Sequence, residues 1–306
     1  MIPGIDPKVD YAFKKVFGSE ANADLLQDLL GAVLGFRVAA VEIVNPFNDK
    51  EAADDKLSVL DVKARDEQGR WYNVEMQMCS HAALVPRLLY YWAKLYSGQM
   101  AEGRDFATLR PAYSVCFVDS RLFDRRPDVY HNRFRALDGD TGEVLTEQFS
   151  MHIVELPKFM TGVDDVGTQL QRWCYYFRHG ETLDTEALPP TLDDPLVRKA
   201  MEVLMRLSQD VHERDRYENR VKFQLDQRQF QADLADALEK GMEKGMEKGM
   251  EKGSLYGRIQ AFQLMLEQQE TPRQELAKLS VDELQRFAAD LQRQATSGKG
   301  ASHEAG

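Results

Sequence analysis

Two neighbouring segments in the first third of the chain alternate apolar and polar residues, which predicts a pair of β-strands. The strands would cover residues 57–65 and 71–79, with a turn-forming cluster at residues 66–70 between them. In a hairpin symmetrical about Gln68, positions 61 and 75 pair, since each lies seven residues from the centre. Strand side chains alternate between the two faces of a sheet. One face then carries Leu60, Val62, Ala64, Tyr72, Val74, Met76 and Met78, and the other carries Asp61, Lys63, Asn73, Glu75 and Gln77.

Helical spacing of apolar residues before the hairpin predicts two helices. The first surrounds Phe13, with Asp6 or Asp10 as its N-cap, and the second ends at Gly35. The other elements of this half are a strand over 38–47, a helix over 84–100, a strand over 112–118 and, after a loop-rich stretch, a strand over 149–156. Helices followed by three strands, a helix and another strand predict a mixed α/β layer with a partly parallel sheet.

The second half of the chain has an almost wholly helical pattern. Helices are predicted over 166–179 and 195–209 and from about residue 215. A break near residues 157–163 predicts a subdomain boundary. The expected organisation is a first domain over 1–160, a helical region over 161–238, a repeat over 239–253, C-terminal helices over 254–294 and a disordered tail over 295–306.

The repeat has the four-residue motif Glu-Lys-Gly-Met. A four-residue period on a helix of 3.6 residues per turn shifts by about 40° per copy, so the glycines and the methionines each form a slowly winding stripe. Glycine at every fourth position lets two helices approach closely. Each glycine also costs about 1 kcal/mol in helix propensity. Two interpretations stay open, a helix that makes a homo-oligomer through the C-terminal region and a flexible charged linker.

Composition restricts the class of protein. The 306 residues carry 39 Lys and Arg against 50 Asp and Glu, a formal net charge of −11, so no global positive field indicates nucleic acid. The charge is uneven, because basic residues outnumber acidic ones between residues 70 and 135. The three cysteines have no paired spacing, which argues against a disulfide framework or a zinc site. Without an apolar run of roughly 18 residues or a signal peptide, we expect a cytoplasmic protein with no membrane partner.

Asp61 and Glu75 are the leading candidates for chemistry. Directly opposed carboxylates destabilise a sheet unless something neutralises them. Mg²⁺ takes one or two protein carboxylates and leaves its other positions to water and substrate phosphate, which fits this pair. The Gln77 amide could orient a metal-bound water or touch a phosphate oxygen, and Lys63 could screen the two acids or contact a phosphate. The alternative is an ordinary solvated strand face, on which acids of an acidic chain meet by chance.

Several motifs, taken in order, resemble the Rpn family, recombination-promoting nucleases and transposases of the PD-(D/E)XK nuclease superfamily. They are PKVDYAFKKVFG at 7–18, DVKA at 61–64, VEMQ at 74–77 and RLLYY at 87–91, followed by the Glu-Lys-Gly repeats. The likeness spans roughly residues 5 to 255, and its most specific parts lie in the first 120. The order of the motifs is more specific than any one of them.

This resemblance implies a restriction-endonuclease-like αβββαβ core with a mixed sheet, followed by a helical C-terminal region. It implies Asp61 and Glu75 as ligands of Mg²⁺, with Mn²⁺ as a substitute, and places Gln77 where the superfamily usually has Lys. Asp10 resembles an acid often found near the metal in such folds. Its alternative roles are an N-cap or a surface acid.

The resemblance also implies contacts with the DNA backbone from Lys14, Lys63 and Arg87. For Lys14 the alternative is ordinary solvated surface, and for Arg87 it is a stem packed on tyrosine. Residues 121–135 interleave arginines with aromatic residues, as in a nucleic-acid patch or in a solvated loop anchored by aromatics.

The expected function is therefore that of a Mg²⁺-dependent DNA endonuclease that hydrolyses phosphodiester bonds, linked to recombination or mobile elements. The alternative is a catalytically quiet interaction or oligomerisation protein built on a nuclease-like fold.

Overall fold

The structure is a computed structural model that describes residues 1–44, 61–78, 83–103 and 105–300. The predicted strand positions at 45–47 and 57–60, Leu60 among them, and Cys79 lie outside this range. The chain divides into two compact units, Met1–Phe223 and Gln224–Gly306.

A six-stranded mixed sheet forms the centre of the first unit, in the order β1-β2-β3-β4-β6-β5. Strand β3 pairs with β4, and β4 with β6, in parallel, whereas the other neighbours are antiparallel. The predicted mixed, partly parallel sheet is confirmed. Its strands are β1 (Val41–Ile43), β2 (Asp61–Asp66), β3 (Trp71–Gln77), β4 (Ala112–Val118), β5 (His131–Leu137) and β6 (Val144–Glu155).

The β2–β3 hairpin has the predicted register. Asp61 pairs with Glu75 and Lys63 with Asn73. Gly69 in the turn has a φ of 79°, in the left-handed region that glycine adopts without the steric cost of a Cβ. Because a shift of one residue would turn every side chain to the other face, this register decides which residues lie together.

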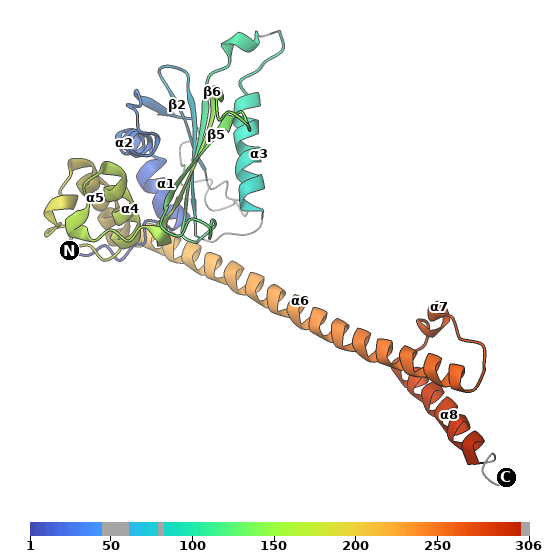
Figure 1. Cartoon of the computed structure of the whole chain (residues 1–306). Helices are drawn as coiled ribbons and strands as arrows, with labels where there is room; N and C mark the ends of the chain where they lie inside the picture. Colours follow the sequence, from blue (N-terminus) through green and yellow to red (C-terminus); the bar gives the residue numbers. More distant parts are fainter. Residues whose placement is uncertain (45–60, 79–82, 104, 301–306) are drawn as a thin grey trace. The chain divides into compact units, whose positions relative to one another are not determined.

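Helices cover both faces of the sheet (Figure 1). On one face, α1 (Asp10–Phe17), α2 (Ala23–Leu34), α4 (Gln169–His179) and α5 (Pro195–Gln209) share a core with Val62, Val74 and Met76, the apolar face of the hairpin. On the other face, α3 (Leu84–Ser97) packs Leu84 and Leu88 against β4 and β6. Asn73, Glu75 and Gln77 alternate with the apolar residues and therefore belong to the α3 face.

Two local expectations were wrong. Neither Asp6 nor Asp10 caps α1, because Val9 occupies the N-cap position and Asp10 lies in the first turn. The stretch read as loop contains β5 and the first part of β6. Strand β5 lies at the edge of the sheet, where charged residues are favoured, so Arg133 and Arg135 concealed its strand character.

Short 3-10 helices connect these elements. They are η1 (Glu20–Asn22), η2 (Phe106–Thr108), η3 (Leu156–Lys158), η4 (Val163–Asp165) and η5 (Pro190–Leu192).

The second unit is helical. It contains the greater part of α6 (Val211–Met265), then α7 (Arg273–Leu276) and α8 (Val281–Gly300). Leu255 and Ile259 of α6 share a small core with Leu276, Leu284 and Leu291. Residues 239–253 of the repeat are helical within α6. Among the described residues, no helix combines the length and the apolar character that crossing a membrane requires.

Candidate functional site

Glu75 is completely buried in the middle of the sheet. Asn73 Nδ2 donates to Glu75 Oε1 over 2.9 Å, and Gln77 Nε2 donates to Glu75 Oε2 over 3.2 Å. All three residues come from β3, where residues two apart share a face. The strand therefore holds one carboxylate between two side-chain amides, and both of its oxygens are oriented.

The backbone places Asp61 directly opposite Glu75, at the start of β2. Lys63, the next residue of β2 on this face, pairs with Asn73 and is half-buried. The hairpin thus brings the predicted positions 61, 63, 75 and 77 into one short stretch of two paired strands.

The neighbouring strand β4 completes the surroundings of Glu75. Cys116 pairs with Glu75 across the β3–β4 ladder. Burial raises the pKa of the Cys116 thiol well above its usual value, the negative charge of Glu75 raises it further, and the positive charge of Arg87 lowers it. Arg87 of α3 is half-buried. The Glu75 carboxylate and the Arg87 guanidinium therefore both lie close enough to Cys116 to shift the pKa of its thiol.

Two buried oxygens near Glu75 lack a hydrogen-bond partner among the described residues. They are Asn73 Oδ1 and Ser114 Oγ, and their residues pair across β3 and β4. Amide and hydroxyl oxygens, like carboxylates, are hard ligands that suit Mg²⁺ or an ordered water. Among the described residues, no group of three or more His, Cys, Asp or Glu side chains is placed to hold a metal ion. A donor set of one or two carboxylates with neutral oxygens fits Mg²⁺, which keeps several waters.

Asp10 is buried on α1, near the end of the sheet at which β3 finishes. Arg220 of α6 holds its carboxylate, with Nη2 and Oδ2 2.5 Å apart. Two residues earlier, Lys8 lies 3.3 Å from Asp119, whose amide donates to the Gln77 carbonyl over 2.8 Å. Asp10 is thus neither an N-cap nor a surface acid, but a buried member of an ion pair.

Lys14 is half-buried on α1, which covers the face of the sheet opposite to that of Glu75. Its neighbour Lys15 pairs with Glu213 of α6 over 3.0 Å. The structure therefore places Lys63 and Arg87 on the Glu75 face and Lys14 on the other.

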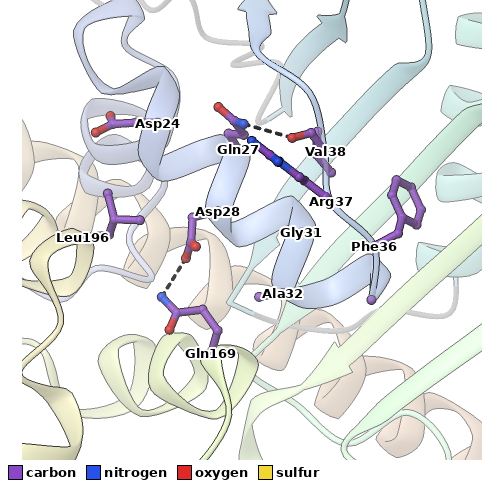
Figure 2. Close-up of a pocket in the computed structure, with 11 residues that line it drawn as sticks. Asp24, Gln27, Asp28, Gly31, Ala32, Phe36, Arg37, Val38, Gln169 and Leu196 are labelled. Carbon is purple, nitrogen blue, oxygen red and sulfur yellow. Dashed lines mark hydrogen bonds between the residues drawn. The ribbon is translucent and has the colours of Figure 1, made fainter. Parts of the chain in front are cut away.

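An open hollow between α2, α4 and α5 lies elsewhere in this unit (Figure 2), and the predicted site residues are not among those that line it. Its polar groups join the helices. Asp28 accepts hydrogen bonds from Gln169 over 2.7 Å and from Trp173 over 2.8 Å, and Gln27 donates to the Val38 carbonyl over 2.9 Å. The hollow is thus built on contacts that hold the helical layer together.

A comparison with family models shows to which family the chain belongs. A model described as PD-(D/E)XK nuclease family transposase matches residues 7–233, which is well over half of the 306-residue chain. The chain belongs to this family. A search of curated proteins and a search of solved structures each found no match.

Membership of the PD-(D/E)XK nuclease family transposases agrees with the six-stranded mixed sheet and its flanking helices. At the level of the family it makes the chain a nuclease-type hydrolase. Such nucleases generally use divalent metal ions, and the matched residues include the whole β2–β3 hairpin.

Sequence reasoning did not find Ser114 or Cys116 as neighbours of Glu75. Both lie in a strand that was predicted with its correct bounds, but their place beside β3 depends on parallel pairing after the α3 crossover. A hairpin register follows from the turn, whereas a parallel register depends on tertiary packing. The strand alternation predicts that Asn73 lies on the same face as Glu75, but it does not predict their hydrogen bond, because that bond depends on the side-chain rotamers.

Proposed function

We propose that the protein is a Mg²⁺-dependent DNA endonuclease in which Glu75 and Asp61 bind the metal and Gln77 assists. The supporting observation is the buried Glu75 carboxylate, oriented by Asn73 and Gln77 and opposite Asp61 in the strand register. Mn²⁺ would substitute for Mg²⁺, because both accept oxygen ligands. The family's description as transposases supports a role in recombination or mobile elements.

Each residue has a distinct task in this proposal. A bound divalent cation would lower the pKa of a water and stabilise charge on the scissile phosphate. The amides of Asn73 and Gln77 fix the rotamer of Glu75, so the carboxylate needs little reorganisation to bind. Gln77 stands where the superfamily usually has Lys and supplies a neutral donor in its place.

The remaining members of the proposed set contribute charge. Lys63 and Arg87 lie on the Glu75 face and would contact the substrate phosphates, with Lys14 a more distant backbone contact from α1. Asp10 would be an additional acid near the metal. It lies in the first turn of α1, where Arg220 holds its carboxylate.

Plasmid cleavage tests this function. Purified full-length protein should nick or linearise supercoiled DNA with Mg²⁺ or Mn²⁺ and not with EDTA. Glu75→Ala and Asp61→Ala should each lower the rate at least about 100-fold, because removal of an electrostatic or metal-binding group from an active site typically costs that much. Glu67→Ala is the matched control, since Glu67 is an exposed acid in the turn of the same hairpin. Equal rates for the wild type and Glu75→Ala would contradict the proposal.

The exposed stripe of the repeat favours a second function, self-association. Met242, Met246 and Met250 are 69%, 66% and 65% exposed on α6. A Cβ added at Gly241, Gly245 or Gly249 would meet nothing within 4 Å.

On a helix with 100° between residues, the Gly and Met stripes are adjacent, with Lys bordering the glycines and Glu bordering the methionines. In a parallel pair of copies related by a two-fold axis, each Lys border would meet the partner's Glu border, whereas an antiparallel pair would oppose like charges.

Sedimentation velocity tests this pairing. The full chain should associate at tens of micromolar, and Met242→Glu/Met246→Glu/Met250→Glu should return it to a monomer, because three acids would replace the apolar contact. The matched control, Met242→Leu/Met246→Leu/Met250→Leu, keeps the apolar stripe and should associate like the wild type. A monomeric wild type, or association that survives the three glutamates, would exclude pairing through this stripe.

A further inference from the structure

The loop that follows β4, residues 119–130, begins beside the candidate site. Strands β3 and β4 run in parallel and end together, and the amide of Asp119 donates to the Gln77 carbonyl over 2.8 Å. Lys8 also holds the Asp119 carboxylate, at 3.3 Å. The loop therefore starts at the end of the sheet where Gln77 lies.

A completely buried ion pair fastens the middle of the loop. Lys158 Nζ lies 2.8 Å from Glu155 Oε2, and both side chains are fully buried. The second carboxylate oxygen of Glu155 accepts from the amides of Leu122 at 2.6 Å and Phe123 at 3.2 Å. Lys158 donates to the carbonyls of Phe123 at 2.7 Å and Arg126 at 2.9 Å. A buried charge pair is stabilising only when its other hydrogen bonds are satisfied, and here the loop backbone satisfies them.

The far end of the loop is fastened in the same way. The amide of Glu155 donates to the Tyr130 carbonyl over 2.7 Å, and Asn132 Nδ2 donates to Glu155 Oε2 over 2.8 Å. The Phe123 ring packs against Phe134 at 5.5 Å between centroids. The loop is therefore held at its start, its middle and its end, without regular secondary structure of its own.

This fixed backbone presents three exposed arginines, Arg121, Arg125 and Arg126. None of them forms an ion pair with another described residue, whereas Arg135 on β5 is paired with Glu147. The guanidinium is the side chain best suited to phosphate, because it is planar, always charged and able to donate two parallel hydrogen bonds. The loop also carries the exposed Asp124 and Asp128, so its three arginines and two acids stand on a fixed backbone that starts beside Gln77.

We propose that residues 119–130 form a phosphate-binding loop, in which Arg121, Arg125 and Arg126 hold the backbone of a DNA duplex beside Glu75. The proposal rests on the proposed nuclease function and assigns the residues that position its substrate. Most hydrogen bonds between proteins and DNA go to phosphates and fix the register of the duplex without reading its sequence. The buried Glu155 and Lys158 act through the loop and are positioning residues.

Fluorescence anisotropy with a labelled 20-base-pair duplex in EDTA tests binding without cleavage. The full-length variant Arg121→Gln/Arg125→Gln/Arg126→Gln should raise the Kd at least about tenfold at 0.1 M salt. The slope of log K against log salt should fall by about 2 to 3, since each lost phosphate contact removes about 0.9. Arg121→Lys/Arg125→Lys/Arg126→Lys keeps the charges and should keep most of the slope.

A matched control separates local contacts from overall charge. Arg37, Arg65 and Arg110 are also exposed and form no ion pair with a described residue. Arg65 and Arg110 lie at the other end of the sheet, where β2 ends and β4 begins, and Arg37 follows Phe36, whose ring stacks with Arg70 of the hairpin turn. Arg37→Gln/Arg65→Gln/Arg110→Gln changes the net charge equally and should leave the Kd within about twofold. Equal losses in the two triple variants, an unchanged Kd in the loop variant, or a wild type that binds no duplex would each overturn the proposal.

Failure of this proposal is distinguishable from failure of the nuclease function. If the wild type cleaves DNA through Glu75 while the loop variant binds like the wild type, only the loop assignment falls. If the loop variant loses binding while the wild type does not cleave, the loop assignment stands and the nuclease function falls.

Discussion

At the scale of single residues, His131 and His152 form a pair between β5 and β6 of the first unit. His131 Nε2 lies 2.9 Å from His152 Nδ1, and Ser150 Oγ lies 2.9 Å from His152 Nε2. Burial lowers the pKa of His131 to about 4, with a further contribution from Arg133. Burial also lowers the pKa of His152 to about 3, and the charges of His131 and Arg133 add to this. Both rings are therefore neutral in the folded protein at neutral pH.

These depressed pKa values predict a loss of stability in acid. An unfolded histidine takes up a proton below about pH 6.5, whereas the folded rings resist protonation until near pH 4 or below. The stabilisation is complete above pH 6.5 and is lost as the pH falls through this window. For one such histidine, the free energy of unfolding should fall by about 2 kcal/mol from pH 7 to pH 5.

His152→Gln tests this, because glutamine keeps polar groups near Ser150 and His131 but does not titrate. Urea unfolding at pH 7 and pH 5 should show a drop in stability about 2 kcal/mol smaller in the variant than in the wild type. His212→Gln is the control, since it replaces an exposed histidine of α6 outside the His131–His152 pair. A variant whose drop equals that of the wild type would show that the pair does not control acid stability.

At the scale of elements, local signals gave the hairpin and its register. The turn residues and the alternation of apolar and polar residues in β2 and β3 lie within one short segment of the chain. The sequence alone therefore predicts that Asp61 pairs with Glu75. The αβββαβ order was also predictable, because each helix or strand has its own periodicity. Strand β5 was missed because its pattern is that of a charged edge, and Ser114 because its neighbour is set by parallel pairing. The partner of Asp10 lies 210 residues away, on α6, and no local pattern encodes such a distance.

The first turns of α6 bind α1. Besides the ion pair of Asp10 with Arg220, Glu213 accepts from the Tyr11 hydroxyl over 2.7 Å and pairs with Lys15 over 3.0 Å. Burial and the hydrogen bond to the acidic Glu213 both raise the pKa of Tyr11. This part of α6 therefore completes the first unit.

Two truncations test that role. A chain of residues 1–223 keeps these contacts and should unfold within a few degrees of the Tm of the first unit in the full chain. A chain of residues 1–209 leaves the buried Asp10 carboxylate without Arg220, and breaking a buried pair costs about 3–5 kcal/mol. Its Tm should fall by roughly 10 °C, at 2–4 °C per kcal/mol for a domain of this size. Differential scanning calorimetry measures both, and equal Tm values for the two truncations would show that α6 adds nothing to the unit.

At the scale of the whole molecule, net charge and local charge give opposite indications about DNA. The chain has a net charge of −11, so a duplex is repelled on average. Residues 119–130 have no formal net charge, because Asp119, Asp124 and Asp128 balance three arginines, but the exposed arginines can contact phosphate locally. Long-range repulsion is screened beyond about 8 Å at physiological ionic strength, whereas contacts at a few ångströms persist. The distribution of charge therefore governs binding more than its sum.

The buried Glu155–Lys158 pair gives the loop two kinds of response to ions. Dissolved salt does not reach a pair whose side chains are fully buried, so the shape of the loop is insensitive to ionic strength. The arginines on its surface are open to competing ions. A rise in salt would therefore release a bound duplex without changing the conformation of the phosphate-binding loop, so that binding through this loop would be reversible.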